Sequence, residues 1–271
     1  MLPFAAQNAH HGAQQRAEIV EELRRQLSRG VAAEARPLPV GLPAIDAHLP
    51  QGGIPGSALH EVMPDSRGDM PAAFGFMAAM LSRIRSVRPG GAPLFLVTSP
   101  CGLATLGRPY GHGLNGFGLD PARVILVEAQ NATQALWATE EALNSAAPAA
   151  VAGMIGKLDF RASQRLHLAA GTAERLLLLL RPPGMTSVAV TRWRVASAPA
   201  ALDRFGLMTR WRWQVRLERC RNGRPDQWIV EFDHATHRFS LAAALADPTL
   251  SRSLLPTLPR SRGRERIRVA S

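Results

Sequence analysis

The chain has 271 residues, 46% hydrophobic and 20% charged, a composition that excludes an intrinsically disordered protein. Its formal net charge of +11 favours acidic partners, nucleic acid among them. Lys157 is the only lysine, so the other 31 basic residues are arginines. Codon bias in a GC-rich genome explains the choice of arginine, but it does not explain where the charge lies.

Cysteine usage and hydropathy indicate the compartment. Cys101 and Cys220 share no metal-ligand spacing, and a reducing cytosol suits two cysteines that form no disulfide framework. The N-terminus turns polar by Gln7, and no stretch approaches the roughly 20 apolar residues that span a bilayer. We therefore expect a cytoplasmic protein with no membrane partner.

The N-terminal part predicts a helix and a linker. Within residues 13–27, Val20, Leu23 and Leu27 recur at helical spacing, with glutamates and arginines around them. The prolines between residues 30 and 43 are typical of a linker. We predict three parts: helix and linker over 1–38, a domain over 39–247 and a basic, flexible tail over 248–271.

Strands and helices are predicted to alternate between residues 56 and 183. Short apolar runs predict strands, two of which (94–99 and 123–129) we expect to be buried in a parallel sheet. This alternation indicates right-handed crossovers between parallel strands. The other strands are expected near 58–62 and within 149–156 and 175–184, and the helices over 71–84, 133–144 and 163–174.

The pattern then changes to alternating strands, predicted over 187–195, 208–220 and 226–233. Asn222-Gly223 is a hairpin turn signal between the last two. The predicted fold class is therefore α/β, with a mostly parallel sheet that is flanked by helices and ends in an antiparallel hairpin.

The stretch EVMPDSRGDMPAAFGFM has the layout of a phosphate-binding loop, G-x-x-x-x-G-K-[ST], between a strand and a helix. Met63 stands at the first glycine, Gly68 at the second, Asp69 at the lysine and Met70 at the hydroxyl residue. A carboxylate would repel phosphate, and a thioether cannot hold magnesium. We predict no bound nucleotide, no cofactor and no ATP hydrolysis.

Three further features could indicate a dinucleotide site, a metal site or a catalytic serine. GHGLNG (residues 111–116) matches G-x-G-x-x-G, but it precedes a strand, so we interpret it as a flexible surface loop. No metal site is predicted from two histidine groups, because neither has a convincing third ligand; they are His10-His11 and the set Asp233, His234 and His237. No base partner is identifiable for Ser57, Ser66 or Ser99, so no catalytic residue is predicted.

The strand WRWQVRLER places tryptophans on one face and arginines on the other. The tryptophans are interpreted as core residues in preference to a surface on which bases stack. The arginine face is either a solvated face or a surface that binds phosphates or an acidic protein. The partner or nucleic-acid binding candidates on this face are Arg210, Arg212 and Arg216.

The last 21 residues carry six arginines and one glutamate. They contain too few apolar residues to form a core, so we expect this tail to order only on an acidic partner surface or on DNA. The candidate residues here are Arg260, Arg262, Arg264, Arg266 and Arg268.

Several stretches resemble the ImuA family, the RecA-like accessory proteins of bacterial SOS mutagenesis cassettes, which are related to SulA. They are GLPAIDAHLPQGGIPGSALHEV, GLDPARVILVEA, TRWRVASAPA and LERCRNGRPDQWIVEFDHATHRFSL. The resemblance runs from about Pro39 to Leu245, and the last two stretches are its specific parts.

This resemblance implies a RecA-like core without a nucleotide site and without catalytic residues. It also implies a non-catalytic adaptor in error-prone translesion DNA synthesis. The implied partners are ImuB, a Y-family polymerase-like protein, together with RecA, an error-prone replicative-type polymerase and DNA, contacted directly or through partners.

Three alternatives remain open from the residues. An active RecA-class ATPase is disfavoured by Asp69 and Met70. A SulA-like cell-division inhibitor would act by protein binding but would not need the arginine-rich C-terminal third. A protein whose main activity is direct DNA binding would show a steep salt dependence.

Overall fold

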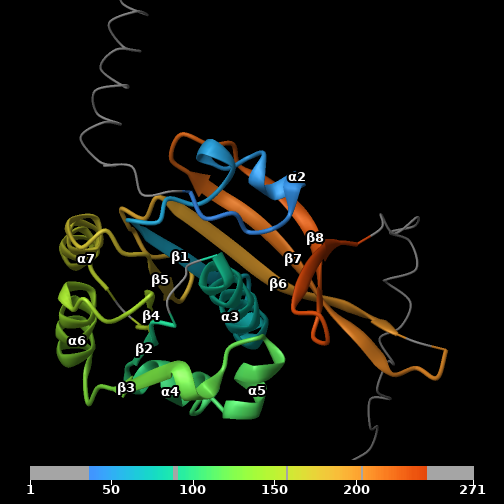
Figure 1. The fold of residues 1–271 in the computed structure, drawn as a ribbon, viewed down its shortest axis with the longest axis horizontal. Coiled ribbons are helices and arrows are strands. Elements are labelled where there is room, and N and C mark those ends of the chain that lie inside the picture. Colours follow the sequence, from blue (N-terminus) through green and yellow to red (C-terminus); the bar gives the residue numbers. More distant parts are fainter. Residues whose placement is uncertain (1–36, 88–90, 157, 203, 243–271) are drawn as a thin grey trace, which may run out of the picture. The chain divides into compact units, whose positions relative to one another are not determined.

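The computed structural model describes residues 37–87, 91–156, 158–202 and 204–242. In these residues nine strands form one sheet in the order β3-β2-β4-β5-β1-β6-β7-β8-β9 (Figure 1). The pairs from β3 to β6 are parallel, and the pairs from β6 to β9 are antiparallel. The predicted α/β class, with a mostly parallel core that ends in antiparallel strands, is confirmed.

The parallel part coincides closely with the predicted strands: β1 (Leu59–Pro64), β2 (Leu94–Thr98), β3 (Val124–Glu128), β4 (Ala150–Met154) and β5 (Leu177–Leu180). The prediction that residues 123–129 form a buried strand was wrong. In the described sheet β3 is an edge strand with Ile125 42% exposed. A continuous apolar run does not reveal whether a strand has a neighbour on both sides.

The predicted helices are present as α3 (Met70–Val87), α6 (Ala132–Asn144) and α7 (Phe160–Thr172). Asn131 and Asp159 set the starts of the last two, because their side chains accept hydrogen bonds from backbone N–H groups of the first turn. The other α-helices of the described residues are the short α2 (Pro43–Asp46), α4 (Pro100–Leu106) and α5 (Gly111–Gly116).

Helix α5 corrects the interpretation of GHGLNG as a flexible loop. The hexapeptide forms a short helix despite its three glycines, and Leu114 on it is buried in the core. Burial of an apolar side chain therefore outweighs the low helix propensity of glycine. The segment follows α4 and not a strand, which agrees with our rejection of a dinucleotide fingerprint.

The helices cover both faces of the parallel part (Figure 1). On one face α3 packs over β1, β5 and β6, and its Phe76 contacts the rings of Trp193 and Trp213 at 5.8 and 6.2 Å between centroids. On the other face α6 and α7 bury a second apolar cluster with residues such as Leu143, Leu166 and Leu177. The core therefore has two layers separated by the sheet.

The antiparallel part consists of β6 (Thr191–Leu202), β7 (Met208–Cys220), β8 (Asp226–Asp233) and β9 (Arg238–Leu241). Strands β7 and β8 match the prediction, and Asn222 between them has a φ of 61°, as its turn requires. The predicted strand 187–195 was wrong in its bounds, because β6 starts later and continues to Leu202. Strand β9 was not predicted.

Several predictions lie outside the described residues, namely the helix over 13–27, most of the linker, the residues after Ala242 and His10-His11. The predicted domain bounds therefore stay predictions. Among the residues that the structure does describe, no helix is long and apolar enough to cross a membrane.

A buried polar chain connects β1 to β6. The Nε2–H of His60 donates to the Pro55 carbonyl at 2.8 Å, because a carbonyl can only accept. Its Nδ1 then accepts from the Thr191 hydroxyl at 2.8 Å, and that hydroxyl accepts from the Trp193 indole at 2.9 Å. Burial, helped by nearby His167, lowers the pKa of His60 to about 4.

We expect His60 to make the protein less stable in mild acid. The pKa is near 6.5 in the unfolded chain and about 4 in the folded one, so the unfolded state binds the proton first as the pH falls. Stability is fully present above pH 6.5 and declines towards pH 4, by at most about 1.4 kcal/mol per pH unit from this residue. Urea unfolding between pH 7 and 4.5 measures it.

The control for this prediction is the variant His60→Gln, which removes the titration but keeps His167, whose pKa burial also lowers. The variant should show a shallower decline over the same range. An equal slope in both proteins would contradict the assignment to His60.

Candidate functional site

The segment that aligns with a phosphate-binding loop connects β1 to α3. Met63, at the position of the first glycine, lies inside β1 and is fully buried. Gly68 lies in a single 3-10 turn over Arg67–Asp69, and Met70 begins α3. The segment joins a strand to a buried helix, as predicted.

The Asp69 carboxylate serves as a structural joint. It accepts hydrogen bonds from the backbone N–H and the hydroxyl of Ser66, at 3.0 and 2.6 Å, and from the backbone N–H of Ser197 in β6, at 2.8 Å. Partial burial raises the pKa of Asp69, but these hydrogen bonds outweigh it and hold the pKa below its ordinary value. The side chain at the lysine position therefore ties the start of α3 to β6.

A cavity of about 470 Å³ lies at the carboxyl ends of β1, β4 and β5, where open α/β sheets bind their ligands. Its walls are mostly apolar and include Pro64, Met154, Ile155 and Leu180. Two arginines also line it, the exposed Arg67 and the buried Arg181, whose guanidinium pairs as described next. The apolar walls suit an apolar group better than a triphosphate.

Beside this cavity lies a buried cluster of three charges. Glu61, in β1, has no exposed side-chain area, and Arg181, directly after β5, has 1%. Their side chains are 2.5 Å apart, and Arg181 also donates to the Leu158 carbonyl at 2.8 Å. Arg192 approaches the other Glu61 oxygen from β6 at 3.3 Å. No sequence signal indicated this cluster, because its members are far apart along the chain.

The structure brings Arg210, Arg212 and Arg216 together on one face of β7, as predicted, with Trp213 on the opposite face. Each arginine has a carboxylate partner. Arg210 and Arg212 both pair with Glu231, and Arg216 lies 3.3 Å from Asp65. Partial burial raises the pKa of Glu231, but the two arginines outweigh it and lower that pKa. A phosphate on this face would compete with carboxylates already in place.

The other binding candidates, Arg260, Arg262, Arg264, Arg266 and Arg268, lie outside the described residues. Asp233 and His237 stand at the two ends of the turn between β8 and β9. Within the part of the chain that is described, no group of three histidine, cysteine or acidic side chains could hold a metal ion.

The hairpin of β6 and β7 forms an arm that was not predicted. Strand β6 pairs with β1 only from Thr191 to Val195, and β7 pairs with β8 only from Trp211 onward. Residues 199–202 and 204–210 therefore lie on a two-stranded arm that projects from the sheet (Figure 1). Large apolar side chains are exposed near its tip: Leu202, Phe205, Leu207 and Met208.

Exposed apolar clusters of this kind mark interaction sites in soluble proteins. The guanidinium of Arg204 lies 4.7 Å from the centre of the Phe205 ring. The signal in the sequence was the run RFGLM between two alternating strands, where a turn is usually polar. The strand predicted over 187–195 ends before this run, whereas β6 extends to Leu202 and carries it to the tip.

Comparison with known proteins gives one consistent result. The chain is 36% identical over 240 residues to Protein ImuA from two strains of Caulobacter vibrioides. The match covers 80% of this chain and 94% of the length of each relative. No protein-family model matches the chain.

We expect Glu61→Gln to destabilise the fold strongly. The substitution keeps the shape of the side chain but leaves Arg181 buried without a counter-charge, which typically costs about 3–5 kcal/mol. The matched control is Glu140→Gln, which breaks a pair with the largely exposed Arg165 and should cost less than about 1 kcal/mol. Urea unfolding of both variants measures the difference, and similar losses would show that the buried cluster is not special.

Proposed function

This chain belongs to the ImuA family, and from that premise we propose that it is a non-catalytic adaptor in SOS-induced, error-prone translesion DNA synthesis. The match to Protein ImuA over 80% of the chain carries this proposal. The proposed partners are an ImuB-type, Y-family polymerase-like protein and, through the same assembly, RecA and an error-prone replicative-type polymerase. Since these proteins act on chromosomal DNA, we propose a cytoplasmic location.

We further propose that the sheet is a RecA-like core that has lost its nucleotide site. The parallel strands with helices on both faces are compatible with such a core. The absence of the required lysine and hydroxyl at Asp69 and Met70 supports a protein that does not hydrolyse ATP. The role of Asp69 as a joint between α3 and β6 supports the same proposal.

The arm of β6 and β7 is the surface that we propose for docking the polymerase-like partner. Phe205 and Leu207 are 71% and 65% exposed, and a few side chains commonly carry most of the binding energy of a protein interface. The base of the arm is held rigidly in the sheet between β1 and β8. A rigid base reduces the entropy lost on binding.

Magnesium-ATP should leave the melting temperature unchanged. Any ligand that binds only the folded state raises stability, by about 2.7 kcal/mol at one hundred times its Kd. The positive control is a RecA-class ATPase with an intact phosphate-binding loop, under the same conditions. Stabilisation of this protein by ATP at millimolar concentration, or measurable turnover, would refute the non-catalytic adaptor.

The double variant Phe205→Ser/Leu207→Ser should bind the ImuB-type partner at least about tenfold more weakly, since truncation of an interface anchor costs about 2 kcal/mol or more. Its melting temperature should stay nearly unchanged, because both side chains are exposed. The measurement is co-purification followed by titration of the purified partner.

The matched control for the arm is Leu168→Ser on α7, where the leucine is similarly exposed and far from the arm in sequence. It should leave partner binding intact. Full affinity in the arm variant would place the docking surface elsewhere on the protein.

A further inference from the structure

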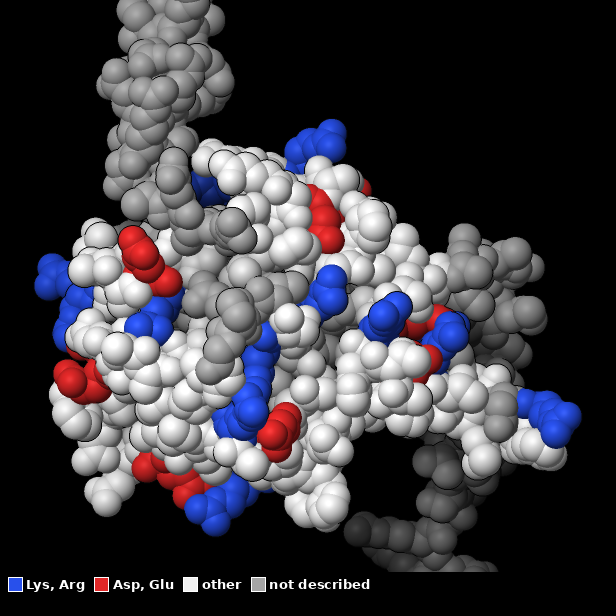
Figure 2. All heavy atoms as spheres, viewed as in Figure 1, with Lys and Arg blue, Asp and Glu red and all other residues white. Residues whose placement is uncertain are grey.

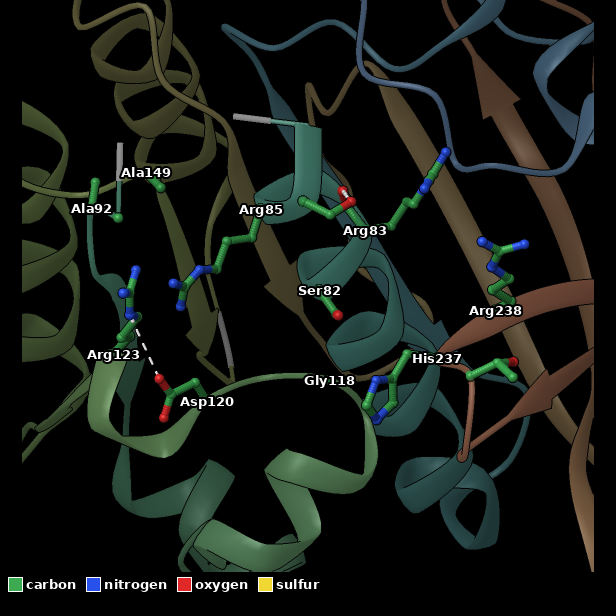
Figure 3. A pocket seen from close by; sticks show the side chains of 13 residues that line it. Ser82, Arg83, Arg85, Ala92, Gly118, Asp120, Arg123, Ala149, His237 and Arg238 are labelled. Atoms are coloured by element: carbon green, nitrogen blue, oxygen red, sulfur yellow. Dashed lines mark hydrogen bonds and ion pairs between the residues drawn. The ribbon is translucent and has the colours of Figure 1, made fainter. Parts of the chain in front are cut away.

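A second cavity, of about 500 Å³, lies at the amino ends of β2 and β4, opposite the edge where the other cavity lies. Five parts of the chain form it: the last turns of α3, the residues just before β2, the residue just before β4, the segment between α5 and β3, and the turn between β8 and β9 with the first residue of β9. Figure 3 shows the side chains that line it.

This cavity is strongly basic. Four of its lining residues are arginines and one is an aspartate: Arg83, Arg85, Arg123, Arg238 and Asp120. Asp120 pairs with Arg123 at 3.5 Å, and Asp46 nearby lies in the field of Arg83. The arginines therefore outnumber the carboxylates, unlike on β7, where Arg210, Arg212 and Arg216 face Glu231, Asp233 and Asp65.

One donor in the cavity has no acceptor. The Nη1 atom of Arg85 is buried and has no hydrogen-bond partner among the described residues. A buried donor left unpaired typically costs about 1–3 kcal/mol, so an acceptor supplied by a ligand would be favoured. The attraction between a cation and the carboxyl end of a helix accounts for one arginine in the last turn of α3. It does not account for Arg123 and Arg238, which come from other elements.

The charges extend along the cavity. Figure 3 shows Arg85 and Arg123 on one side of α3, and Arg83 and Arg238 on its other side, with Ser82 and His237 between them. Figure 2, in the same orientation as Figure 1, shows basic side chains spread across the middle of this face with few acidic ones among them. Cations on both sides of α3 suit a ligand with several negative groups better than a single ion.

We propose that this cavity binds consecutive phosphates of a single-stranded nucleic acid. Guanidinium groups match phosphate with paired hydrogen bonds, and the hydroxyl of Ser82 adds a donor between the arginines. Apart from the His237 imidazole, the described lining holds no aromatic ring on which a base could stack. Recognition is therefore through the backbone and independent of sequence. This role is separate from the docking of a protein partner by the arm.

The test compares Arg85→Gln/Arg123→Gln with the control Arg108→Gln/Arg165→Gln in the full chain, without any partner. Both pairs remove two positive charges, and the control arginines are exposed residues whose pairs lie outside this cavity. Binding of a fluorescent oligothymidine is measured by anisotropy over a range of salt concentrations. Thermal melting of every variant confirms that it is folded.

We expect the cavity variant to bind oligothymidine roughly tenfold more weakly and to lower the slope of log K against log salt by about 1.4, as expected for two lost contacts to a single strand. The control variant should keep most of the affinity for oligothymidine and most of the salt slope. Equal losses in the two variants, or no oligothymidine binding by the unmodified protein at low salt, would overturn the proposal.

A second probe separates a strand from a small ligand. Inorganic tripolyphosphate should displace the oligothymidine only weakly at equal phosphate concentration. Efficient displacement would identify a compact polyphosphate as the ligand and overturn the assignment to a strand. None of these outcomes depends on the polymerase-like partner, so they are independent of the proposed adaptor function.

Discussion

The fold depends on a charge placed in the middle of the sheet. Glu61 has no exposed side-chain area, and burial of a carboxylate is costly in free energy unless cations pair with it. The strands on both sides of β1 supply them, Arg181 after β5 and Arg192 opposite Glu61 in β6. A slip of β6 by one residue would turn Arg192 to the other face, so the cluster fixes the register where the parallel and antiparallel parts meet.

The same strand that completes this cluster also creates the arm. The first residues of β6 pair with β1. The strand then continues to Leu202, where β7 is its only neighbour among the described strands. An isolated hairpin is marginal in water, but this one is anchored at its base by the Trp213 and Phe232 packing in the core. The exposed tip is thus carried by a stable support, which a docking surface requires.

Most of the framework could be predicted from the sequence, because periodicity reports local structure directly. Strands β7 and β8 and helices α3 and α6 follow from alternation, apolar runs and caps. What could not be predicted depends on neighbours. Whether β3 lies at an edge, whether Leu114 is buried in α5, and where β6 ends are all decided by distant parts of the chain.

The charged sites were harder to predict from the sequence than the secondary structure. The sequence predicted that Arg210, Arg212 and Arg216 share one face of a strand. It did not predict their carboxylate partners, which lie on another strand and on a loop. The basic cavity could not be predicted from the sequence, because Arg85, Arg123 and Arg238 lie on three separate elements. The number of arginines in a stretch of sequence therefore does not predict uncompensated charge. That charge depends on which carboxylates the fold places beside each arginine.

The Asp69 carboxylate connects the segment between β1 and α3 to the rest of the structure. Its carboxylate holds the start of α3 to β6, so a lysine there would remove the acceptor for Ser66 and Ser197 as well as reverse the charge. At this carboxyl end of the sheet, Arg181 is already neutralised by Glu61. The exposed Arg67 also lines the cavity at this end, whereas three arginines from separate elements, Arg85, Arg123 and Arg238, gather at the amino end. Any recognition of phosphate by the described part of this protein is therefore more favourable at the amino end, opposite the edge where a nucleotide-binding α/β protein would place it.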